Sequence, residues 1–133
     1  MVLRILIVDD ERPIIEVLIE IFETNGYEVV GSATSGEDAL SKYASLSPYP
    51  DIVIMDHRLP MKTGLETMRG ILRMDPSARV LFVSADSSIR KNALAEGAAG
   101  FILKPFDMTE LLGCIQTVMT KDDRLGETTI PGR

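Results

Sequence analysis

Strand and helix patterns alternate five times along the chain. Short, nearly continuous apolar runs predict strands at 3–8, 27–30, 51–55, 80–83 and 100–103. Polar turns and helically spaced apolar residues follow them, and predict helices at 12–24, 36–47, 64–74, 88–96 and from 108 onward. This alternation is typical of a parallel sheet with helices on both faces, and the apolar runs fit strands buried on both sides. We therefore expect an α/β fold with a doubly wound, five-stranded parallel sheet and five helices.

Local signals set the helix boundaries. In the first helix, one apolar stripe is predicted from Ile14, Val17, Leu18, Ile21 and Phe22. Gly26 and Gly97 are expected to end helices, and so is the pair Asp75–Pro76. Ser35 and Asp107 are expected as N-caps.

Length and composition point to one ordinary globular domain. The chain has 133 residues and is 45% hydrophobic, so we expect one domain over residues 1–121 and a flexible polar tail over 122–133. The chain has no apolar run of about 20 residues and no leader pattern, which favours a cytoplasmic protein without a membrane partner. Cys114 is the only cysteine, and we expect it to be a buried spacer. The net charge of −6 argues against direct nucleic-acid binding.

Chemistry-bearing residues follow four of the predicted strands. Asp9 and Asp10 come directly after the first strand, and Asp56 after the third; Ser84 and Lys104 follow the fourth and fifth. The carboxyl ends of parallel strands meet at one edge of a sheet, where such folds place their ligands. Three acids would repel one another there unless a cation joined them, and Mg²⁺ (or Mn²⁺) prefers oxygen ligands. Because a carboxylate can also accept a phosphoryl group, the pattern predicts a site for a divalent cation and a phosphoryl group.

The chain resembles the receiver domain of two-component response regulators, in particular the single-domain, chemotaxis-regulator-like members. The resemblance covers about residues 3–119 and rests on four pieces in order: Val8-Asp9-Asp10, Met55-Asp56 with Pro60 and Gly64, Ser84-Ala85, and Lys104-Pro105-Phe106. One departure lies in the segment Pro60-Met61-Lys62-Thr63-Gly64, where the family often has methionine at the position of Lys62. The resemblance implies a flavodoxin-like (βα)5 domain with strand order 2-1-3-4-5.

The resemblance also implies a role for each site residue. Asp56 would be the phosphoacceptor, served by a sensor histidine kinase or a phosphotransfer protein. Asp10 would bind Mg²⁺ directly, Asp9 mainly through water, and Asp56 and the Arg58 backbone carbonyl would be further ligands. Ser84 would bond the phosphoryl group and Lys104 would neutralise it.

The same resemblance implies a switch. Ser84 would move toward the phosphoryl group, Phe101 would fill the vacated space, and the surface of the fourth helix, fifth strand and fifth helix would change shape for a downstream protein or a phosphorylation-dependent homodimer. The peptide bond before Pro105 would be cis. Such a protein catalyses only its own phosphorylation and dephosphorylation.

Several alternatives stay open at this stage. A haloacid-dehalogenase-like phosphohydrolase would need an acid at position 58, and a flavin protein would not place Asp9-Asp10-Glu11 in its first loop. A phosphorylation-independent interaction module of the same fold remains, as does the N-terminal receiver fragment of a larger regulator. We also expect Arg58 and Asp86 to face each other as an ion pair, and His57 to point away from the site.

Overall fold

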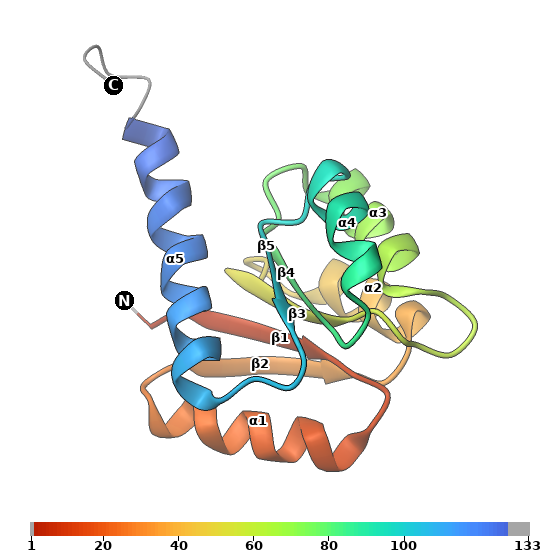
Figure 1. Cartoon of the computed structure of the whole chain (residues 1–133), viewed down its shortest axis with the longest axis horizontal. Helices are drawn as coiled ribbons and strands as arrows, with labels where there is room; N and C mark the ends of the chain where they lie inside the picture. The colour runs from red at the N-terminus through yellow and green to blue at the C-terminus, as the bar shows by residue number, and fades with distance from the viewer. Residues whose placement is uncertain (1, 128–133) are drawn as a thin grey trace.

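The computed structural model describes residues 2–127 and consists of one parallel sheet with helices on both faces (Figure 1). The elements in chain order are β1 (Arg4–Val8), α1 (Arg12–Thr24), β2 (Glu28–Ala33), α2 (Gly36–Ser45), β3 (Ile52–Asp56), α3 (Gly64–Met74), β4 (Val80–Ser84), the 3-10 turn η1 (Ser87–Ile89), α4 (Arg90–Ala95), β5 (Gly100–Leu103) and α5 (Met108–Glu127).

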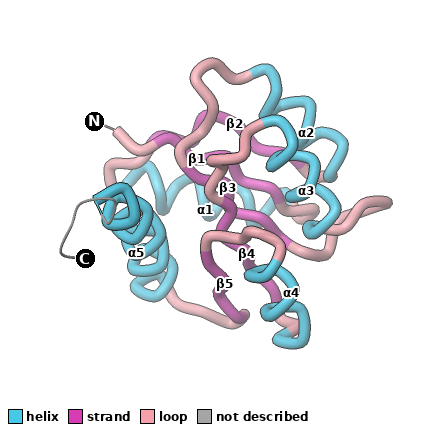
Figure 2. Tube along the Cα trace, turned by 90° about the horizontal axis from the view of Figure 1, so that it is seen from above, coloured by secondary structure: helices cyan, strands magenta, loops and turns pink. Residues whose placement is uncertain are grey.

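The strand order is β2-β1-β3-β4-β5, and all neighbouring strands are parallel. Helices α1 and α5 lie on one face of the sheet, and α2, α3 and α4 lie on the other (Figure 2). The sheet is doubly wound, as the sequence pattern predicts, and its strand order is the flavodoxin-like one that the resemblance implies.

Side chains that alternate along each strand divide the interior into two cores. In β3, Ile52 and Ile54 pack toward α1 and α5, whereas Val53 and Met55 pack toward α2 and α3. Both cores therefore fix the strands in register, and a slip of one residue would exchange the two faces. The rigid sheet holds the carboxyl ends of its strands at one level.

The predicted helix signals act through specific hydrogen bonds. The Ser35 hydroxyl accepts a bond from the Asp38 amide at 3.1 Å. Asp107 and Glu110 form reciprocal bonds at the start of α5, each side chain accepting from the other's amide. Gly26 and Gly97 both have positive φ, +87° and +117°, as expected for residues that end helices.

The predicted stripe on α1 is wrong in part. The buried side chains are Ile15, Leu18 and Phe22, while Ile14 and Val17 are 40% and 53% exposed. The first two turns are apolar over a wider arc than the sheet can cover, so the rotation of the helix is set by packing against β1 and α5 rather than by its own sequence.

Other boundaries differ at the ends of elements. The strand β2 extends to Ala33, and the helix predicted over 88–96 is a 3-10 turn followed by only six α-helical residues. Helix α5 runs to Glu127, so it includes the start of the segment expected as a tail; residues 128–133 lie outside the described residues. Within the described part, no helix has the length and apolarity needed to cross a membrane.

Candidate functional site

The strand register brings the predicted site residues to one edge of the sheet. Val8 pairs with Met55, so Asp9 and Asp56 follow at the same level on neighbouring strands. Asp56 in turn pairs with Val83, and Ser84 pairs with Leu103, the residue before Lys104. The structure therefore gathers side chains that are up to 95 positions apart in the sequence, as the strand pattern predicts.

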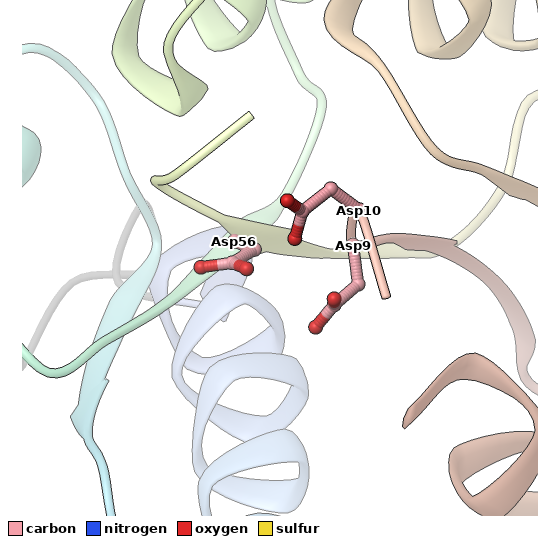
Figure 3. Close-up of side chains that lie close together, drawn as sticks. All are labelled: Asp9, Asp10 and Asp56. Carbon is pink, nitrogen blue, oxygen red and sulfur yellow. The ribbon is translucent and has the colours of Figure 1, made fainter. Parts of the chain in front are cut away.

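Three carboxylates form the centre of this edge. Each of Asp9, Asp10 and Asp56 offers an oxygen, and these atoms all lie within 4.8 Å of one another (Figure 3). Asp9 and Asp56 are 6% and 7% exposed, whereas Asp10 is exposed at the mouth. Negative charge is thus concentrated at a point that is open to solvent on only one side.

Burial changes the acidity of the two enclosed carboxyls. Desolvation raises the pKa of Asp9 above its ordinary value, and the Glu11 amide, which donates to Asp9 Oδ1 at 2.8 Å, offsets part of that rise. Desolvation also raises the pKa of Asp56, and the negative charge of Asp10 adds to this effect. Both acids are therefore harder to ionise than free aspartate, which is the condition that a bound cation relieves.

Lys104 is the positive group of the site. Its Nζ lies 3.7 Å from Asp56 Oδ1, and its charge lowers the pKa of Asp56 against the effect of burial. The lysine follows β5 directly, and the Lys104–Pro105 peptide bond is cis, as expected. Its ammonium group can contact Asp56 and any anion attached to it.

Ser84 lies at the end of β4 and is 4% exposed. Its Oγ accepts a hydrogen bond from the Asp86 amide at 3.0 Å, so it is engaged with the following loop. The hydroxyl hydrogen remains available for donation. Ser84 is therefore a donor whose position is coupled to the loop that leads into η1 and α4.

The loop after Asp56 folds back tightly against the end of β3. Gly64 donates its amide hydrogen to the His57 carbonyl at 2.9 Å, and a Cβ at Gly64 would lie only 2.5 Å from the Asp56 carbonyl oxygen. The Arg58 amide is 3.4 Å from Asp56 Oδ1. Thr63 and Glu66 then close the loop with a capping box at the start of α3. A residue without a side chain at position 64 is what permits this close approach.

Phe101 lies in β5, away from the carboxylates. It is partly buried against the core beneath α2, α3 and α4, and it lines a groove of about 450 Å³ bounded by α4 and α5. Cys114 lines the same groove and is half-buried, so it is less enclosed than expected; burial nonetheless raises the pKa of its thiol. Phe101 thus connects the interior with the surface of α4, β5 and α5.

Two further expectations meet different outcomes. The His57 ring packs against Phe82, with ring centroids 6.1 Å apart, on the side of the sheet that α2, α3 and α4 cover, and it also lines a cavity together with Asp10 and Arg58. Among the described residues, no ion pair joins Arg58 to Asp86, and the expected pairing is not formed. The Asp86 carboxylate instead accepts bonds from the Ser88 amide and hydroxyl, which hold the pKa of Asp86 below its ordinary value.

Sequence reasoning missed this role of Asp86. The signal was available, because Asp followed by Ser two residues later is typical of a side-chain-capped turn. We predicted Arg58, across the site, as the partner of Asp86. Ser88 is only two residues away from Asp86, so a hydrogen bond between them costs much less conformational entropy than an ion pair with Arg58.

The donor set fits a hard divalent cation. Two buried carboxylates and one exposed carboxylate offer oxygen ligands at close range, and the exposed side leaves room for water. A cavity of about 40 Å³ beneath them is lined mainly by apolar side chains, with Asp9, Asp56 and Lys104 at its edge.

Comparison with known proteins gives one consistent answer. The family model described as "Response regulator receiver domain" matches residues 5–116. The chemotaxis protein CheY of Thermotoga maritima is 37% identical over 117 residues, which are 86% of this chain and 96% of that protein. Protein CcdB of Bacillus subtilis is 38% identical over 118 residues, covering 87% and 97%.

A solved structure is similar over most of its length as well. The CheX–CheY–BeF3–Mg complex from Borrelia burgdorferi matches with a TM-score of 0.84 and 34% identity, over 88% of this chain and 89% of that chain.

Proposed function

This chain belongs to the response regulator receiver domain family, and from that premise we propose that Asp56 is its phosphoacceptor in a Mg²⁺-dependent reaction. Receiver domains are signalling modules, and phosphorylation and partner switching are typical of the family. The observation that carries the proposal is the position of Asp56, which ends a central strand between two other carboxylates and the Lys104 ammonium group.

The residues that would hold the cation are Asp10 directly, Asp9 mainly through water, Asp56, and the backbone carbonyl of Arg58. A bound Mg²⁺ supplies charge neutralisation for the carboxylates and for the phosphoryl oxygens. Support for this assignment comes from the oxygen-only donor set and from the Mg²⁺ named in the similar Borrelia complex.

The transfer itself is carried by Asp56. An ionised carboxylate oxygen forms a bond to phosphorus while the bond from phosphorus to the donor breaks, and the donor keeps that electron pair. The donor is a phosphohistidine of a sensor kinase or phosphotransfer protein, or a small acyl phosphate. Lys104 contributes in two ways: it favours the ionised form of Asp56, and it contacts the phosphoryl oxygens that arrive there.

Ser84 then responds to the phosphoryl group on Asp56. Its hydroxyl can donate to a phosphoryl oxygen if it turns toward Asp56, and this movement weakens the bond that it now accepts from Asp86. The space that it leaves is available to Phe101, which borders both the core and the groove between α4 and α5. The proposed output is a change in the α4–β5–α5 surface that a downstream protein recognises.

Intact mass spectrometry tests the acceptor. The protein is incubated with acetyl phosphate, with and without Mg²⁺, beside Asp56→Asn and the control Asp38→Asn, which removes a partly exposed acid on α2. We expect a gain of one phosphoryl group that needs Mg²⁺, is kept in Asp38→Asn, and is lost in Asp56→Asn. Binding of Mg²⁺ without any mass gain would instead favour a docking module that works without phosphorylation.

A further inference from the structure

Helix α4 is held by few contacts. It has six residues, Arg90–Ala95, and only Ala93 among them is buried. Leu94 is 40% exposed, and no side chain caps the first turn of the helix. Since apolar burial is the main force that fixes a helix on a sheet, the position of α4 depends on the polar contacts at its two ends.

The N-terminal end is connected to the phosphorylation site. The Asp86 carboxylate accepts from the Ser88 amide at 2.9 Å and from the Ser88 hydroxyl at 2.6 Å, which orders η1. The Asp86 amide donates to Ser84 Oγ at 3.0 Å. Three hydrogen bonds thus lead from Ser84 to the start of α4.

The C-terminal end is held on α3 by an ion pair. Arg69 Nε and Nη2 contact Glu96 Oε1 and Oε2 at 2.6 Å and 3.0 Å, so both oxygens of one carboxylate are bound. The next residue, Gly97, has a φ of +117°, and a Cβ there would lie 2.9 Å from Leu72 Cδ1. The chain therefore turns tightly against α3 at the point where the ion pair forms.

We infer that the Arg69–Glu96 pair is a latch that favours the present position of α4 over the position it takes when Ser84 turns toward a phosphoryl group. A two-point contact between guanidinium and carboxylate tolerates little displacement. A helix of six residues is only about 9 Å long and moves as a unit, so a shift at η1 is transmitted to Glu96. The inference rests on the proposed role of Ser84.

A consequence for binding follows from linkage. A contact that exists only in the unswitched arrangement opposes every ligand that prefers the switched one. Removal of the latch should therefore raise the affinity for a phosphoryl mimic at Asp56, although the pair joins α3 to the end of α4 and forms no hydrogen bond with Asp56 or Ser84.

Calorimetric titration with beryllofluoride in saturating Mg²⁺ provides the test. The variants are Arg69→Ala and Glu96→Gln, and the matched control is Arg73→Ala, an exposed arginine one turn further along α3. We expect both latch variants to bind beryllofluoride about 1.5- to 5-fold more tightly than the unmodified protein, the range of a partly exposed ion pair, with no change in the control. The difference should shrink in high salt.

A charge exchange gives a stricter criterion. The double variant Arg69→Glu/Glu96→Arg should return the affinity toward that of the unmodified protein. Amide hydrogen exchange over 90–97 should be faster in the single variants, while exchange in β4 stays the same.

Each failure has its own signature. If the unmodified protein does not bind beryllofluoride, the proposed function is wrong. If it binds but the latch variants match Arg73→Ala, or bind more weakly, the function stands and the latch is wrong. Faster exchange throughout the sheet would show that the pair supports the whole fold rather than α4, and would also overturn the inference.

Discussion

Replacement of Asp56 by asparagine should make the metal-free protein more stable at neutral pH. The change keeps the shape of the side chain and removes one of three negative charges whose oxygens lie within 4.8 Å of one another. Two carboxylates at 4.8 Å repel by about 3.5 kcal/mol when the effective dielectric constant is about 20. Burial of Asp56, the largest cause of its raised pKa, adds to this repulsion, and the attraction to Lys104 at 3.7 Å offsets only part of the sum.

We therefore expect Asp56→Asn to raise the free energy of unfolding by about 1–3 kcal/mol at pH 7 without divalent cations. Urea denaturation followed by circular dichroism measures this directly. The control is Asp38→Asn, because Asp38 lies 3.3 Å from Lys42 and is more than a third exposed. Loss of that favourable pair should lower stability by no more than about 0.5 kcal/mol, the opposite sign.

The pH dependence gives a second criterion. Because the folded-state pKa of Asp56 is raised above 3.8, its protonated form favours folding: this contribution is complete below pH 3.8 and is lost as the pH rises through the folded-state value. The advantage of Asp56→Asn should thus be absent at pH 3.8 or below and grow toward pH 7. Mg²⁺ should reduce this stability difference, because the cation stabilises the unmodified protein, which has three acids, more than it stabilises Asp56→Asn. A variant that is less stable than the unmodified protein at pH 7, or an advantage independent of pH, would refute the reasoning.

Two more outcomes follow from the site. Lys104→Met should slow phosphorylation by acetyl phosphate and move its pH profile upward, because Lys104 lowers the pKa of Asp56; a profile at the same pH would contradict the role given to its charge. Gly64→Ala should lower the free energy of unfolding by about 1–3 kcal/mol and weaken Mg²⁺ binding, because the new Cβ would lie 2.5 Å from the Asp56 carbonyl oxygen. Thermal denaturation measures the loss of stability. The control is Gly113→Ala, whose Cβ would meet nothing within 4 Å.

The site could be predicted largely because it depends on strand ends. Asp9, Asp56, Ser84 and Lys104 each follow an apolar run, and parallel strands bring such positions together whatever else the fold contains. Contacts between side chains of neighbouring loops were less accessible. Asp86 bonds Ser88 rather than Arg58, since the choice depends on local turn geometry that the spacing of charges does not report.

The interactions that hold α3 and α4 together were not visible in the sequence. Arg69 and Glu96 are 27 positions apart, on elements whose relative placement follows from the packing of both helices on the sheet. The same limit applies to α1, where apolar residues occupy a wider arc than the buried one and Ile15 rather than Ile14 faces the core.

The sequence by itself determined the α/β class, the extent of most elements and the edge of the sheet at which the chemistry lies. These features depend on periodicity, on caps and on glycine and proline, which act over a few residues. Only the tertiary structure decided the rotation of α1, the shortening of α4 and the link from Arg69 to Glu96. Those features depend on competition among distant surfaces for burial and among charged groups for partners, and that competition is settled only when the chain is packed.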